Sequence, residues 1–251
     1  MIDRRTFLLS TAAATVAESL ERLRGSRRDR AGLAAEPLAE AESARQAPSA
    51  EKLVPPTDGK VKVACVLSSN VTLIDWVGPE AVFDAWVHDE ATGQDRSLFE
   101  LFTVGESREL RDPGFNAIPD YTYDNAPQAQ VIVVPAQDGS PRFYRWLKKA
   151  SESAHLTMSV CIGARHLAKL GLLDGRVATT HHDFIKPFAQ EFPKVHWVSG
   201  RRFVEGPKVA TSAGVTAGID LALHVVDRYF GREKAVAVTK VIEYQGTAWM
   251  V

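Results

Sequence analysis

Short apolar runs rich in β-branched residues alternate with segments of helical periodicity along this chain, and that alternation limits the folds open to it. The runs that indicate buried strands lie at 61–67, 97–104, 130–134 and 155–160. Helical spacing occurs at 75–87, 141–153, 163–173 and twice near the C-terminus. Because strands that alternate with helices form mainly parallel sheets covered on both faces, the sequence predicts a single three-layer α/β/α domain over residues 60–251.

The first residues carry a different signal. Arg4 and Arg5 precede a short apolar, small-residue run, and residues 1–17 resemble a twin-arginine export signal. Residues 18–59 are rich in Ala, Glu, Arg, Ser and Pro without sustained periodicity, which predicts a disordered linker. The pattern predicts export to the periplasm, and a cytoplasmic protein with a frayed amphipathic N-terminus is the alternative.

Charge and motif content indicate which partners to expect. The net charge is −1 and no basic stripe occurs in the predicted domain, so nucleic acid is not an expected partner. No apolar run reaches membrane-spanning length. The glycine-rich segment 212–220 lacks the phosphate-loop and dinucleotide spacings, and the seven histidines form no Cys/His cluster, so neither a cofactor nor a metal is expected. A small-molecule substrate remains the expected partner.

The two cysteines occupy different sequence contexts. Cys65 lies inside a β-branched run, where a small thiol packs well in a buried strand. Cys161 falls between a strand-like run and a helical segment, on the turn where a nucleophile projects from the end of a sheet. The N–H groups of Ile162 and Gly163 follow it at the predicted helix N-terminus. This position predicts a reactive thiol and favours its thiolate form.

Other polar groups are expected at the same edge of the sheet. Asp75 opens a predicted helix, where it acts either as an N-cap or as an acid that exchanges protons with the thiol. Ala136 and Gln137 follow a buried strand and offer backbone N–H groups to a developing anion, unless this is an ordinary turn. His181 follows a short strand and is a candidate base, although a lone histidine is more often a structural partner.

Four segments together resemble the ThiJ/PfpI superfamily, which has a flavodoxin-like, glutamine-amidotransferase-like fold. They are LIDWVGPEAVF, VIVVPA, SVCIGARHLAKLGLLDGRVATTHH and ATSAGVTAGIDLALHVVDRYFG. They look closest to the isonitrile hydratase branch and to the sensor domains of AraC-type regulators. The resemblance implies that Cys161 is the elbow cysteine, that Asp75 is the acid hydrogen-bonded to it, and that the protein forms a homodimer.

The resemblance also implies a function, with two departures from the pattern. In the hydratase branch the thiolate attacks an isonitrile, and water then releases an N-substituted formamide. The hydratase pattern has Thr where this chain has Ile162, and Pro-Gly-Gly where it has Pro135-Ala136-Gln137. Ile162 also departs from the His that accompanies peptidase activity in the superfamily. The leading hypothesis is therefore a cysteine-dependent enzyme similar to isonitrile hydratase.

Two alternatives stay open. The first is glyoxalase- or deglycase-like action on small aldehydes, for which His181 would be the base. The second is a non-catalytic sensor or binding module. Because only QGTAWMV follows Tyr244, the sequence predicts no DNA-binding domain of the regulator type in this chain.

Overall fold

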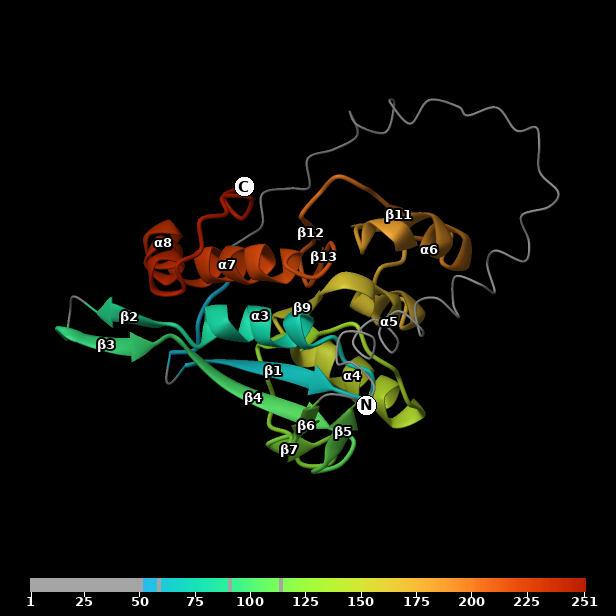
Figure 1. Ribbon diagram of the computed structural model, residues 1–251, viewed down its shortest axis with the longest axis horizontal. Coiled ribbons are helices and arrows are strands. Elements are labelled where there is room, and N and C mark those ends of the chain that lie inside the picture. The colour runs from blue at the N-terminus through green and yellow to red at the C-terminus, as the bar shows by residue number, and fades with distance from the viewer. Residues whose placement is uncertain (1–51, 58–59, 90–91, 113–114) are drawn as a thin grey trace, which may run out of the picture. The chain divides into compact units, whose positions relative to one another are not determined.

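The computed structural model describes residues 52–57, 60–89, 92–112 and 115–251 (Figure 1). The predicted signal at 1–17 and nearly all of the predicted linker at 18–59 lie outside these residues. Residues 52–57 are described, and there the Leu53 N–H donates to the Arg228 carbonyl (3.0 Å) while its side chain packs on the core. Contacts with the domain therefore begin upstream of residue 60.

A seven-stranded sheet forms the centre of the domain, and its strand order is β12-β13-β9-β8-β1-β4-β7. All neighbouring strands pair in parallel except β12 and β13. The strands are β1 (Val61–Leu67), β4 (Phe99–Gly105), β7 (Tyr121–Thr122), β8 (Val131–Val134), β9 (Leu156–Ser159), β12 (Phe203–Glu205) and β13 (Val209–Ser212). The predicted mainly parallel α/β fold is confirmed.

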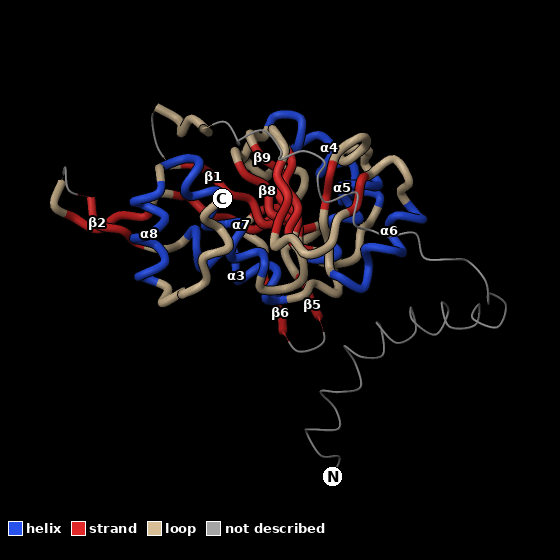
Figure 2. The backbone as a smooth tube through the Cα atoms, turned by 90° about the horizontal axis from the view of Figure 1, so that it is seen from above, coloured by secondary structure: helices blue, strands red, loops and turns tan. Residues whose placement is uncertain are grey.

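Helices cover both faces of this sheet because successive strand residues point to opposite sides. On β1, Val63 and Cys65 join one apolar core, while Ala64 and Val66 join another. The first core contains residues of α3 (Leu73–Phe83), α7 (Ala217–Phe230) and α8 (Arg232–Val241). The second contains residues of α4 (Pro141–Ser153) and α5 (Ala164–Lys169). Figure 2 shows the strands between these two groups of helices.

Smaller elements lie outside the central sheet. They are the hairpin β2 (Trp86–Asp89) and β3 (Gln94–Ser97), the hairpin β5 (Leu110–Asp112) and β6 (Phe115–Ala117), the parallel pair β10 (Val177–Ala178) and β11 (His196–Trp197), the 3-10 turns η2 (Cys161–Gly163) and η3 (His182–Phe184), and helix α6 (Ile185–Glu191). The first hairpin projects from the domain in Figure 1. No helix among the described residues is both long and apolar enough to cross a membrane.

Two predicted helices differ from the observed ones. Residues 86–87, expected at the end of a helix, instead begin β2, because this segment pairs with β3. The helix expected over 163–173 ends at Lys169, and the chain turns through Gly171, whose φ is +72°. A left-handed conformation at glycine ends a helix without a steric penalty.

The C-terminal segment is part of the core. Trp249 is completely buried, its indole N–H donates to the Gly246 carbonyl (3.0 Å), and the Arg232 guanidinium lies 5.1 Å from its ring centroid.

We predict that Trp249→Ala lowers the free energy of unfolding by about 3–5 kcal/mol, because it removes a buried aromatic side chain. Urea denaturation should show a much smaller loss for Trp86→Ala, since Trp86 is 59% exposed. Equal losses for the two variants would contradict this assignment.

Candidate active site

The carboxyl ends of four strands bring the candidate residues together. Strands β1, β8, β9 and β13 run in the same direction, so the segments that follow them meet at one edge of the sheet. These segments carry Asp75 after β1, Ala136 after β8, Cys161 after β9 and Gly214 after β13. Ligands of open parallel sheets bind at this edge. The alternation of strands and helices in the sequence predicted such a sheet.

Cys161 occupies a strained turn between β9 and α5. Its φ is +57°, a left-handed conformation that is unfavourable for a residue with a side chain. The Cys161 N–H donates to the Ala213 carbonyl (3.1 Å), and the Thr180 hydroxyl donates to the Cys161 carbonyl (2.9 Å). The turn also requires glycine at 163, where a Cβ atom would lie 2.2 Å from the Val134 carbonyl oxygen. Backbone packing therefore fixes the predicted elbow.

Asp75 is an internal residue of α3 and does not cap it. Thr72 is the N-cap residue, and the Asp75 side chain is completely buried. Its Oδ2 accepts the Ala136 N–H (3.1 Å), whereas Oδ1 has no hydrogen-bond partner within the described part of the chain. The capping alternative is thus excluded by position, and a buried carboxyl oxygen is left available at the sheet edge.

Burial governs the protonation of both groups. Desolvation raises the pKa of Asp75 to about 7, although the Ala136 N–H partly counteracts it. Desolvation, with the charge of Asp75 added to it, raises the pKa of Cys161 to about 11. The N–H groups of Val215 and Ile162 stabilise the thiolate but do not offset these effects. The expectation that the turn favours the thiolate is therefore wrong, because Cys161 is only 7% exposed and a short helix follows it.

The Pro135–Ala136–Gln137 loop holds the acid in place. Because the Ala136 N–H donates to Asp75, it is not a free donor to a substrate anion as the sequence suggested. The Gln137 side chain accepts the Ser68 N–H (2.6 Å) and donates to the Val66 carbonyl (2.9 Å), which ties the loop to the end of β1. Gly163 is similarly occupied, since its N–H donates to the Val160 carbonyl (2.9 Å).

His166, which was not among the residues predicted for the site, supports the same loop. Its Nε2 lies 3.0 Å from the Gln137 carbonyl and its Nδ1 lies 2.9 Å from the Tyr144 hydroxyl. Burial lowers the pKa of His166 to about 4, so the ring is neutral near pH 7. A carbonyl only accepts, so Nε2–H donates to Gln137 and Nδ1 accepts from Tyr144. The segment GARHLAK could have indicated a buried role for this histidine, because its polar ring interrupts a helix of small and apolar residues.

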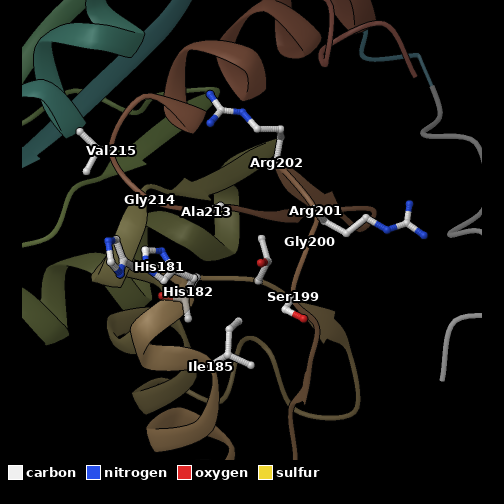
Figure 3. Close-up of a pocket in the computed structure, with 12 residues that line it drawn as sticks. His181, His182, Ile185, Ser199, Gly200, Arg201, Arg202, Ala213, Gly214 and Val215 are labelled. Carbon is white, nitrogen blue, oxygen red and sulfur yellow. The ribbon is translucent and has the colours of Figure 1, made fainter. Parts of the chain in front are cut away.

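A pocket of about 290 Å³ adjoins the elbow (Figure 3). Segments 179–182, 199–202 and 213–215 line it together with Ile185. His181 lies in this pocket and its Cδ2 faces Gly214, where a Cβ atom would approach to 2.5 Å. Partial burial and the neighbouring His182 lower the pKa of His181. Among the hydrogen bonds of the described residues, none joins His181 to Cys161.

These features define an α/β protein with a cysteine on a strained strand-to-helix turn and a buried acid at the same sheet edge. A model of the DJ-1/PfpI family matches residues 61–228, and the chain belongs to this family, as its motifs had indicated. A THiJ/PfpI family protein from Pseudomonas syringae has the same fold, with a TM-score of 0.64 at 23% identity over 75% of this chain and 77% of that one.

Curated relatives have two kinds of function. The chain is 27% identical over 198 residues to the HTH-type transcriptional regulator GbdR of Pseudomonas aeruginosa, covering 76% of this chain and 53% of the regulator. It is 31% identical over 140 residues to an isonitrile hydratase of Pseudomonas putida, covering 52% of this chain and 59% of the enzyme. The chain thus spans about half the length of these relatives.

One expectation about partners is corrected by these relatives. The composition of the predicted domain suggested that nucleic acid is not a partner. Besides GbdR, the HTH-type transcriptional regulator CdhR of Pseudomonas aeruginosa is 34% identical over 106 residues, covering 42% of this chain and 31% of the regulator. Because sequence similar to this domain occurs in transcriptional regulators, the composition of the domain does not exclude nucleic acid as a partner.

The buried carboxyl has a consequence for stability. With its pKa raised from 3.8 to about 7, Asp75 favours the folded state most below about pH 4, and this contribution is lost as the pH rises through about 7. We predict that Asp75→Asn becomes progressively more stable than the parent between about pH 4 and 8, by up to about 4 kcal/mol. Urea denaturation across this range tests it, with Asp84→Asn, an exposed position after the same helix, as the control. Parallel stability curves for parent and Asp75→Asn would contradict the buried, neutral carboxyl.

The two thiols should differ in reactivity. We predict that iodoacetamide labels Cys161 before Cys65, which is 1% exposed, and that the rate rises about tenfold per pH unit between about pH 8 and 10. Asp75→Asn should accelerate labelling at a fixed pH, because it removes a negative charge that raises the pKa of Cys161. Intact mass and peptide mapping identify the labelled residue. The assignment fails if Cys65 reacts first in the folded protein.

Proposed function

We propose that this domain binds a small electrophilic molecule and that Cys161 attacks it, with Asp75 carrying the proton, in chemistry similar to that of isonitrile hydratase. One observation carries the proposal: a completely buried carboxyl whose pKa is about 7 acts on the pKa of an elbow cysteine. An acid whose pKa lies near neutral pH is suited both to accept and to donate a proton. The free Oδ1 of Asp75 is the atom assigned to that exchange.

The proposed reaction starts from the neutral thiol, because the pKa of Cys161 is about 11. As the sulfur attacks the terminal carbon of an isonitrile, the Asp75 carboxylate takes the thiol proton and returns it to that carbon, which gives a thioimidate. Water then adds to the same carbon, the carbon–sulfur bond breaks, and the sulfur recovers its proton. The sum is one isonitrile and one water converted to one N-substituted formamide. Covalent catalysis of this kind divides one difficult hydration into two additions.

The departures from the hydratase pattern suggest a slower reaction. Ile162 has no hydroxyl to orient the acid, and among the described residues only the Ala136 N–H donates a hydrogen bond to Asp75. The Ile162 and Val215 N–H groups still reach the sulfur. The aldehyde-directed alternative has less support, since it needs a base at Cys161 and His181 lies against Gly214 instead.

A second candidate function, ligand sensing, is favoured by the regulators among the relatives. A site in which the thiol is only 7% exposed and carries a raised pKa suits recognition of a ligand without rapid turnover. In that case the small molecule would occupy the same edge of the sheet, as a persistent adduct or without a bond to Cys161. Association with nucleic acid would then belong to the function, as it does in the named regulators.

Incubation with an alkyl isonitrile tests the proposal. We expect the intact mass to increase by the mass of one isonitrile, with the change mapped to Cys161, and the N-substituted formamide to accumulate in solution. Cys161→Ala should abolish both signals, whereas Cys65→Ala should retain them. Ile162→Thr should raise the turnover by restoring the missing hydroxyl.

The outcomes separate the two candidate functions. An adduct on Cys161 that persists without formamide would favour sensing over hydration. Neither adduct nor formamide, with Cys161 shown to be alkylatable in the same sample, would overturn the proposed reaction.

A further inference from the structure

Three metal-ligating side chains meet at the mouth of the pocket beside the elbow. His181, His182 and Asp183 each offer one ligand atom, and these atoms all lie within 4.8 Å of one another. The seven histidines are dispersed in the sequence and form no Cys/His cluster, so no metal was expected. The donor set here consists instead of two adjacent histidines and the carboxylate that follows them.

The local backbone explains why consecutive residues gather on one side. In a strand, successive side chains point to opposite faces, but here the strand β10 ends at Ala178 and the chain turns into η3 at His182. His181 precedes this turn, and its Nδ1 accepts the Asp183 N–H at 3.3 Å. The two imidazole rings stack with centroids 4.3 Å apart, and Figure 3 shows them side by side at the pocket.

The distances between the potential ligand atoms are close to those between the ligands of a bound metal ion. Asp183 Oδ2 lies 3.8 Å from His181 Nδ1, and the other carboxylate oxygen, Oδ1, lies 3.4 Å from His182 Nε2. Ligand atoms about 2.0–2.2 Å from a tetrahedral ion lie roughly 3.3–3.6 Å from one another. Small side-chain rotations would close the remaining gap, and the side chains of His182 and Asp183 are 80% and 66% exposed, which leaves them free to rotate.

His181 provides the fixed point of the cluster. Its side chain is only 25% exposed, and its ring edge lies against the backbone of Gly214. A ligand already held in one orientation loses little side-chain entropy when it binds. Binding through His181 Nδ1 would replace the long hydrogen bond from the Asp183 N–H, which lies where water can satisfy it.

We propose that His181, His182 and Asp183 bind one divalent first-row transition-metal ion such as Zn²⁺ at the mouth of the pocket. Two imidazoles and one carboxylate suit Zn²⁺, Co²⁺, Ni²⁺ or Cu²⁺, whereas Mg²⁺ and Ca²⁺ prefer oxygen ligands throughout. Three protein ligands leave a coordination position open to water or to a molecule in the pocket. This site uses neither the Cys161 thiol nor the Asp75 carboxyl, so it stands independently of the proposed reaction.

Titration of the full chain with Zn²⁺ in competition with a chromophoric chelator tests the proposal. We expect one equivalent to bind with micromolar affinity or tighter, and His182→Ala and Asp183→Asn each to weaken it by about tenfold or more. Both substituted residues are exposed, so the variants should retain the parental thermal unfolding curve.

Two controls make the assignment specific. His88 is exposed and pairs with Asp95 at 3.0 Å, but within the described part of the chain this pair belongs to no group of three potential ligands, so His88→Ala should leave Zn²⁺ binding unchanged. Cys161→Ala should also bind normally, which excludes a thiol ligand. The proposal is overturned if the chain binds no Zn²⁺ at micromolar concentration, or if His182→Ala binds as tightly as the parent.

Discussion

The burial of the Asp75 carboxyl is the constraint on which the candidate site depends. Water is excluded from this group, so its pKa rises to about 7, and its charge in turn raises the pKa of Cys161. The backbone N–H of Ala136 donates a hydrogen bond to its Oδ2. Acid and thiol therefore behave as a coupled pair, in which the ionisation of one opposes the ionisation of the other.

A network of hydrogen bonds holds the Ala136 N–H in position beside Asp75. The Gln137 side chain hydrogen-bonds to the end of β1. The Gln137 backbone carbonyl accepts a hydrogen bond from His166, and His166 accepts one from Tyr144 of α4. Helices α4 and α5, on one face of the sheet, thus help to position the Ala136 N–H relative to Asp75, which belongs to α3 on the other face. A neutral histidine with both ring nitrogens occupied is a structural part of this network, and its lowered pKa follows from burial.

The fold could be predicted because its signals are local. The β-branched run of β1 and the small-residue turn at Cys161 each specify their own conformation, and parallel pairing then places their ends at one edge. What the sequence did not reveal depends on surroundings that no short window contains. The raised pKa of Cys161 follows from desolvation by neighbours distant in sequence, and the role of His166 depends on Gln137 and Tyr144, which belong to other elements. The helix predicted over 75–87 ends earlier than its apolar periodicity indicated, because residues 86–87 pair with β3 as part of β2.

The left-handed backbone at position 161 has a consequence for how this residue should be interpreted. Glycine would adopt a φ of +57° without strain, whereas cysteine adopts it at a cost in free energy, although its side chain is also buried in the first apolar core. A cysteine at this point lowers the stability that the turn could have had. Strained backbone of this kind is typical of functional positions, so the conformation at Cys161 favours a role for its thiol beyond packing.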